Sequence, residues 1–235
     1  MDLYGLQKLT LLDYPGRTAC TVFLAGCNLR CPFCHNFEMT PADAASQIPG
    51  ETFFSFLNKR KGLLDGVVVT GGEPCMRPDL ADFLKEVKDL GFQVKLDTNG
   101  FFPARLREVL QKGLADYVAM DIKNSPEKYA ATVGLPDAEL RLDAVKESIS
   151  VIMNSSADYE FRTTVIREYH DESDIRAIGE MIRGAKRYCL QAFVDRETVP
   201  DHALHAPGDD EIRAYAEIMR PFVSEVSVRG VDLAI

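Results

Sequence analysis

Residues 66–91, GVVVTGGEPCMRPDLADFLKEVKDLG, contain one complete strand–loop–helix unit. The apolar run 66–70 predicts a buried strand, which the glycine pair after it ends. A helix then begins at Pro78 and ends at Gly91, because apolar residues recur at helical spacing between a proline start and a glycine stop. A strand followed by a helix in this way is the building block of a parallel sheet.

The same alternation runs along most of the chain. Strand-like apolar runs occupy residues 18–24, 66–70, 92–97, 117–123, 159–166 and 189–194. Helical spacing marks residues 51–61, 78–90, 103–112, 142–152 and 175–185, and a last helix (about 209–220) and a short strand (225–229) close the chain.

Six strand–helix units call for an α/β fold with parallel strands and right-handed crossovers. A partial (β/α)6 TIM-like barrel with an open side and a doubly wound sheet both fit this pattern, and periodicity does not separate them. In either fold the active site lies at the carboxyl ends of the strands.

The composition suits one large domain. The chain has 235 residues, of which 46% are hydrophobic, so one core is expected over residues 1–235. Its 36 acidic residues outnumber its 27 basic residues, which argues against nucleic acid as the main ligand. No run of 18 apolar residues occurs, and the first residues lack the features of a signal peptide. We therefore expect a cytoplasmic protein that does not enter a membrane.

Polar residues collect where the predicted strands end. Three cysteines follow the first strand, the motif GGEP (71–74) follows the second, and DTNG (97–100) follows the third. Asp121 and Lys123 lie at the end of the fourth strand and are two residues apart, which places them on one face. Because parallel strands end at one rim, we expect these residues to lie around one site.

The loop CNLRCPFCHN, residues 27–36, admits three interpretations. Its second half fits the C-x-x-C-H pattern of a c-type haem, but this leaves Cys27 unused and requires a second axial ligand. The three cysteines and His35 also offer four zinc ligands, although structural zinc sites space their ligands in pairs and His35 is adjacent to Cys34. Three thiolates can instead bind three irons of a [4Fe–4S] cube, which leaves one iron open to a substrate or cofactor.

The spacing C-x3-C-x2-C, with Phe33 before the last cysteine, resembles the signature of radical S-adenosylmethionine (SAM) enzymes. The GGEP motif resembles the glycine-rich SAM motif of the same superfamily. The superfamily fold is a partial (β/α)6 barrel, and the resemblance covers about residues 18–195. It implies one radical SAM domain over residues 1–235, with the helix and strand of 209–229 after the core. It also implies two cofactors, a [4Fe–4S] cluster and SAM.

Three further motifs resemble the glycyl-radical-enzyme activases: CHN (34–36), LDTNG (96–100) and DIK (121–123). The opening GLQKLTLLDYPG (5–16) is similar to one branch, the activating proteins of anaerobic ribonucleoside-triphosphate reductase. The resemblance implies reductive cleavage of SAM to methionine and a 5′-deoxyadenosyl radical, which abstracts hydrogen from a glycine of a partner enzyme. The implied partner is a class III anaerobic ribonucleotide reductase, and the implied electron donor is reduced flavodoxin or ferredoxin.

The resemblance also assigns residues to the cluster and to the two ends of SAM. Glu73 and the carbonyl groups of Gly71 and Gly72 would receive the methionine ammonium, because glycines let the backbone approach a ligand closely. Phe33 and His35 would flank the adenine. The implied cluster ligands are Cys27, Cys31 and Cys34.

Further implied contacts come from the later strands. Lys123 would pair with the SAM carboxylate, and Asp121 would hold a cation or the sulfonium charge. Asp97 and Arg162 match ligand-contacting residues of the activases. At the sixth strand the activases carry a histidine where this chain has Gln191, so Gln191 is the expected contact there.

Two other functions stay open from the sequence. A radical SAM enzyme of the deazapurine-forming type would act on a small molecule, but the short chain and the DTNG and DIK motifs favour a protein substrate. A non-catalytic iron–sulfur electron carrier would need neither the GGEP motif nor a missing fourth ligand.

Outside the motifs, Cys20 and Cys189 are expected to be buried free thiols. The remaining histidines, His170, His202 and His205, lie in loop-like segments, and most are expected to be solvated.

Overall fold

The computed structural model describes residues 1–45 and 47–231, and its strands form one sheet in sequence order. The strands are β1 (Gly5–Thr10), β2 (Ala19–Leu24), β3 (Gly66–Gly71), β4 (Gln93–Thr98), β5 (Tyr117–Asp121), β6 (Asp158–Val165), β7 (Arg187–Ala192) and β8 (Glu225–Arg229). A doubly wound sheet would reverse its strand order, so the sequential order excludes that alternative. Among the described residues β8 does not return to pair with β1, which confirms the predicted open, partial barrel.

One helix of nine to twelve residues follows each of the strands β2 to β7, as predicted. These helices are α1 (Gly50–Asn58), α2 (Leu80–Asp89), α3 (Pro103–Gln111), α5 (Leu142–Met153), α6 (Glu172–Met181) and α7 (Asp209–Met219). Short 3-10 helices lie at Phe37–Met39, Pro74–Met76 and Asp137–Glu139. Two elements were not predicted: the edge strand β1, which is antiparallel to β2, and the short helix α4 (Tyr129–Thr132).

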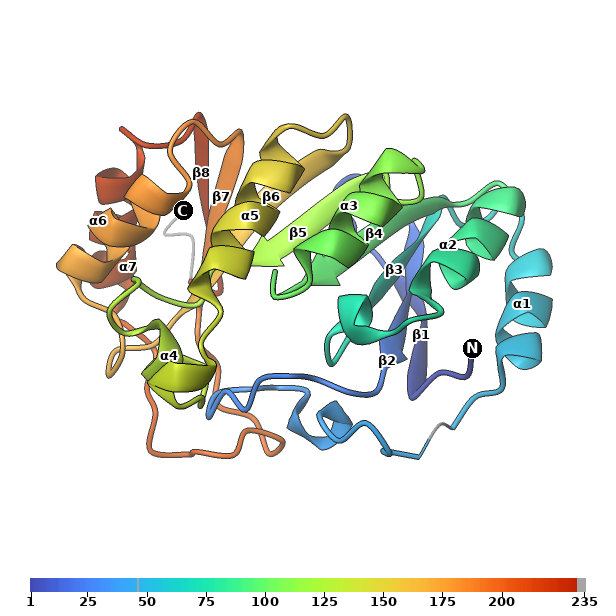
Figure 1. The fold of residues 1–235 in the computed structure, drawn as a ribbon, viewed down its shortest axis with the longest axis horizontal. Coiled ribbons are helices and arrows are strands. Elements are labelled where there is room, and N and C mark those ends of the chain that lie inside the picture. Colours follow the sequence, from blue (N-terminus) through green and yellow to red (C-terminus); the bar gives the residue numbers. More distant parts are fainter. Residues whose placement is uncertain (46, 232–235) are drawn as a thin grey trace.

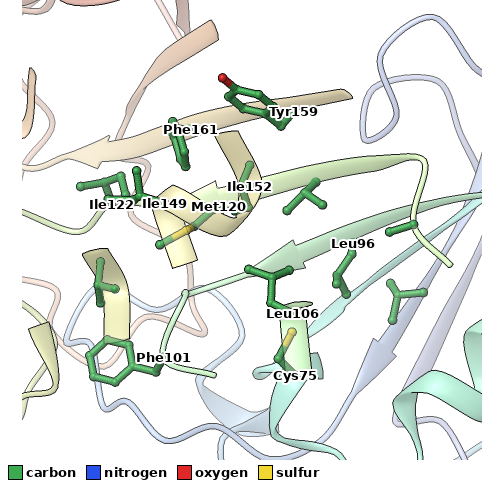
Figure 2. Packing of buried hydrophobic residues seen from close by; sticks show 14 of the residues in the cluster. Cys75, Leu96, Phe101, Leu106, Met120, Ile122, Ile149, Ile152, Tyr159 and Phe161 are labelled. Carbon is green, nitrogen blue, oxygen red and sulfur yellow. The ribbon is translucent and has the colours of Figure 1, made fainter. Parts of the chain in front are cut away.

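The main core lies between the sheet and the helices, which line one side of the sheet from α1 at the right of Figure 1 to α6 and α7 at the left. Figure 2 shows Leu96 of β4 near Leu106 of α3, and Met120 of β5 near Ile149 of α5. The opposite, concave face holds a smaller apolar cluster, made of Tyr14, Ala19, Val68, Tyr117 and Ala119. Charged side chains share this concave face because polar residues alternate with apolar ones along β4 and β6.

The parallel strands end at one rim, and the long connection between β2 and α1 crosses it. The blue segment after β2 runs along the lower edge of Figure 1 and passes beneath α4. The motifs that follow β2, β3, β4 and β5 therefore meet at this rim. In the described part of the chain, no helix has the length and apolarity that a membrane crossing requires.

We expect Phe53→Ala to lower the free energy of unfolding by about 3–5 kcal/mol, because it removes a buried ring and leaves a cavity. Phe53 of α1 is fully buried, and its ring stacks on Phe83 of α2 with 5.5 Å between centroids. Denaturant titration measures the change. Leu12→Ala is the control, since that side chain is 88% exposed and its loss should cost less than about 0.5 kcal/mol. Equal stabilities for the two variants would contradict the packing of α1 on α2.

Candidate active site

The cysteine loop leaves β2 as an irregular segment, and hydrogen bonds connect it to other parts of the chain. The main-chain N–H of Cys27 donates to the carbonyl of Thr40 at 3.0 Å, and that of Arg30 donates to Val133, just after α4, at 3.0 Å. The N–H of Cys34 donates to the carbonyl of Cys31 at 3.1 Å, which closes the turn between the last two cysteines. The loop is therefore wrapped and not helical, as the proline within it predicts.

The three thiols of this loop line one cavity, and all six cysteines of the chain are free. Burial raises the pKa of Cys27 to about 11 and that of Cys31 to about 12, and it also raises the pKa of Cys34. The Lys123 ammonium acts in the opposite direction on each thiol. This cation therefore favours the thiolate form that a metal ligand needs.

The arrangement of the thiols does not suit a single metal ion. Among the described residues, no three His, Cys, Asp or Glu side chains converge as the ligands of one ion do. The zinc alternative is therefore not supported. Thiolates that bind different corners of an iron–sulfur cube need not converge on one point.

The glycine pair after β3 allows the backbone of β3 to meet the cysteine loop. The N–H of Gly72 donates to Leu24 at 2.8 Å. A Cβ on Gly72 would lie 2.1 Å from the carbonyl oxygen of Gly26, so no other residue fits without a backbone shift. Gly71 has a φ of +119° and its carbonyl accepts from the Asn36 side-chain amide at 3.0 Å. Gly71 and Gly72 both line the cavity. The Asn36 amide occupies one lone pair of the Gly71 carbonyl oxygen.

Glu73 is almost fully buried and joins the ends of β3 and β4. Its carboxylate accepts hydrogen bonds from the Cys75 N–H (2.9 Å), the Thr98 hydroxyl (2.8 Å) and the Asn99 N–H (2.6 Å). Burial raises the pKa of Glu73 to about 7, and these donors only partly offset that rise. The carboxylate borders the cavity and braces its wall. The bracing donors Thr98 and Asn99 were part of the DTNG motif, but the sequence did not reveal this role.

A chain of ion pairs forms the floor of the cavity. Arg162 of β6 donates to Asp121 of β5 at 2.7 Å and lies 3.4 Å from Asp97 of β4. Lys123 donates to the second oxygen of Asp121 at 2.9 Å, and Lys95 pairs with Asp97. Three cations therefore face two carboxylates.

The cations hold both carboxyl groups ionised. Burial alone would raise the pKa of Asp121, but the Arg162 guanidinium and the Lys123 ammonium hold it well below its ordinary value. Arg162 and Lys95 lower the pKa of Asp97 in the same way, against the effect of burial. Each oxygen of Asp121 accepts one hydrogen bond, from Arg162 or from Lys123, and keeps a further lone pair for a cation.

Phe33 and His35 lie on the cysteine loop and also line the cavity. The Lys123 ammonium is 5.8 Å from the centroid of the Phe33 ring. The His35 ring stacks on Phe193 at 5.9 Å, and its Nε2 donates to the carbonyl of Val194 at 2.6 Å. The segment after β7 therefore fixes the orientation of His35.

The residues that line the cavity do not include Gln191 of β7, whereas Thr164, its partner on the adjacent strand β6, does line it. Most of the three remaining histidines were expected to be solvated, and His202 and His205 are exposed, each paired with a carboxylate. His170 is the exception, because it is 3% exposed and hydrogen-bonded within the fold.

The chain is similar to known proteins of one superfamily. The model of the radical SAM superfamily matches residues 21–180. A Methanocaldococcus jannaschii protein, provisionally named a glycyl-radical enzyme activating enzyme, is 30% identical over 234 residues, which cover 97% of this chain and 95% of that protein. The pyruvate formate-lyase-activating enzyme of Clostridium pasteurianum is 33% identical over 128 residues, 52% of each chain.

The fold has solved counterparts. The crystal structure of a radical SAM methyltransferase from Sphaerobacter thermophilus matches 96% of this chain and 70% of that chain, with a TM-score of 0.70 and 17% identity. This likeness concerns the fold alone. The family match covers more than half of the chain, and the archaeal relative covers nearly all of it. The chain therefore belongs to the radical SAM superfamily, whose members use a [4Fe–4S] cluster and SAM, and within it to the family of the glycyl-radical enzyme activating enzymes.

Proposed function

We propose that this protein activates a class III anaerobic ribonucleotide reductase by generating a glycyl radical on it. The observation that carries the proposal is the cavity, which is lined together by three thiols, the Gly71–Gly72 backbone and the ion-paired side chains of Lys123, Asp121 and Arg162. The similarity of residues 5–16 to the reductase-activating branch supports the choice of partner. Reduced flavodoxin or ferredoxin is the proposed electron donor, because the chain has no second cysteine cluster for an internal relay.

The thiols of Cys27, Cys31 and Cys34 would hold the cluster. When bound, the cluster and SAM supply the reductive cleavage that yields a 5′-deoxyadenosyl radical, which takes a hydrogen atom from the partner's glycine. The protein itself binds and orients the cofactors and excludes water. A single domain over residues 1–235 would bind and orient both cofactors. We place it in the cytoplasm, whose reducing conditions suit six free cysteines.

The charges of the cavity match the charges of SAM. Lys123 would bind the carboxylate of SAM, because its ammonium lies at the cavity and has N–H donors beyond the one that it gives to Asp121. Asp97 and Asp121 would hold Arg162 and Lys123 in place, and Asp121 would also face the sulfonium. The main chain of Gly71 and Gly72, with Glu73 behind it, would receive the ammonium.

The aromatic groups of the cavity match the base of SAM. Phe33 and His35 would flank the adenine. The His35 ring is already held flat against Phe193, which leaves its other face for a ligand. Gln191 lies outside this set in the structure, so we give it no role in SAM binding.

We expect Cys27→Ala, Cys31→Ala and Cys34→Ala each to abolish assembly of a cluster with about four irons per chain, because each thiolate binds a different iron. Iron and sulfide analysis after anaerobic reconstitution measures this. Cys20→Ala and Cys189→Ala are the controls, since both thiols are buried away from the cavity and should keep the full cluster. A full cluster in any of the three loop variants would refute the ligand assignment.

We expect Lys123→Met to keep the cluster and to weaken SAM binding roughly ten- to hundredfold. A hydrogen bond to a charged group is worth about 1.5–3 kcal/mol, and tenfold corresponds to about 1.4 kcal/mol. Calorimetric titration of the reconstituted protein with SAM measures the loss. Lys85→Met, at an exposed surface ion pair on α2, is the control. Equal affinities in the two variants would show that Lys123 serves only its ion pair with Asp121.

With SAM and a strong reductant, the protein should produce a doublet electron paramagnetic resonance signal on class III ribonucleotide reductase. The doublet should lose its splitting when the reductase glycine is α-deuterated, because the splitting comes from the remaining α-hydrogen. The Cys31→Ala variant should give no signal. Cleavage of SAM without a glycyl radical on any partner enzyme of the same organism would instead favour a small-molecule substrate of the deazapurine-forming type. Absence of SAM cleavage would favour an electron carrier.

A further inference from the structure

Lys123 lies beyond the end of its strand, where the sheet no longer fixes the backbone. β5 ends at Asp121, two residues earlier. In the described part of the chain, the hydrogen bonds of the Lys123 main chain run to two side chains, those of Tyr129 and His170. The position of the Lys123 backbone therefore depends on residues that lie outside the motifs, whereas its ammonium is paired with Asp121 of the DIK motif.

His170 holds the carbonyl side of Lys123. Its Nε2 is 2.9 Å from the Lys123 carbonyl oxygen, and because a carbonyl only accepts, Nε2 carries the proton. Nδ1 lies 3.1 Å from the N–H of Ile166 and 3.2 Å from the carbonyl oxygen of the same residue, and in this tautomer it accepts from the N–H. Both ring nitrogens are therefore used in one neutral tautomer. Burial lowers the pKa of His170, which keeps the ring in this neutral form.

Tyr129 of α4 holds the amide side of Lys123. Its hydroxyl accepts the Lys123 N–H at 3.4 Å, and the ring is fully buried against Phe101, with 6.3 Å between centroids. His170 belongs to the connection between β6 and α6, so the two groups that hold Lys123 come from different parts of the fold. Together they fix the peptide groups on both sides of the Lys123 Cα.

Buried hydrogen bonds anchor the residues that follow Lys123 to the same two parts. The Asn124 amide donates to Thr132 of α4 at 2.8 Å and to the carbonyl of Tyr169 at 3.0 Å. The Ser125 hydroxyl donates to Asp174 of α6 at 2.7 Å. The turn after β5 is therefore tied to α4 and to the start of α6, and His170 and Tyr129 have a rigid base from which to act.

We propose that His170 and Tyr129 are positioning residues that hold the Lys123 ammonium in place for the carboxylate of SAM. This inference rests on the proposed function, in which Lys123 binds that carboxylate. A free lysine side chain loses considerable conformational entropy when it is ordered, so a fixed backbone lowers the cost of placing its charge at the ligand. The neutral His170 acts through the Lys123 carbonyl and not through contact with SAM.

A double-mutant cycle on the reconstituted, cluster-bearing protein tests the proposal. Tyr129→Phe removes only a hydroxyl, and His170→Leu removes both ring nitrogens at similar size. Each variant should weaken SAM binding about two- to tenfold, the loss expected for one neutral hydrogen bond. In a Lys123→Met background the same substitutions should cause no further loss, because the group that they position is gone. His170→Gln, which keeps an N–H donor, should recover part of the affinity.

The outcomes separate this inference from the function on which it rests. Equal losses in both backgrounds, or no loss in the wild-type background, overturn the positioning role even if Lys123→Met weakens SAM binding as expected. Unchanged SAM affinity in Lys123→Met alone overturns the role of Lys123 and this inference with it. Iron content and melting temperature report whether each variant is folded and loaded. If His170→Leu does not fold, the Tyr129→Phe cycle decides the question alone.

Discussion

The bridge that Arg162 makes between Asp97 and Asp121 is the contact on which the floor of the site depends. A buried carboxylate without a partner costs several kcal/mol, and here two of them share one guanidinium. Lys123 and the buried Lys95, which does not line the cavity, complete the chain, so at the cavity itself Arg162 and Lys123 balance the two carboxylates. Such a set of charges is costly as a source of stability, but it suits a cavity that must receive a ligand with charges of both signs.

Glu73 is a buried carboxylate that is stabilised by hydrogen bonds, whereas Asp97 and Asp121 are stabilised by ion pairs. Three hydrogen-bond donors surround it and none of the described cations forms an ion pair with it, so burial dominates and its pKa rises to about 7. Its contacts with Thr98 and Asn99 connect the end of β3 to the end of β4, directly beneath the cysteine loop. The side chain therefore shapes the wall of the cavity, whereas the ion-paired carboxyls of the floor set its charge.

The strand–helix units could be predicted because β2, β3, β5 and β7 bury an apolar run, β4 and β6 alternate apolar with polar residues, and each helix keeps one apolar stripe. β1 was not predicted, because it is an edge strand in which Gln7, Lys8 and Leu9 are exposed. Its sequence therefore lacks the alternation or apolar run that marks a strand with a buried face. The burial of His170 could not be predicted either. Its partners, Lys123 and Ile166, become neighbours only when the turn after β5 packs against the segment after β6.

The cysteine loop shows most clearly that the sequence predicts the residues of a site but not their positions. Its spacing predicts which atoms bind the cluster, but their positions depend on contacts with Thr40, with Val133 after α4 and with the segment after β7, where Thr198 donates to the carbonyl of His35 at 2.7 Å. These partners carry no sequence signature of a cluster site. A substitution at such a partner can move the thiols while every recognised motif stays intact. The geometry of the site is therefore a property of the whole rim and not of the motifs alone.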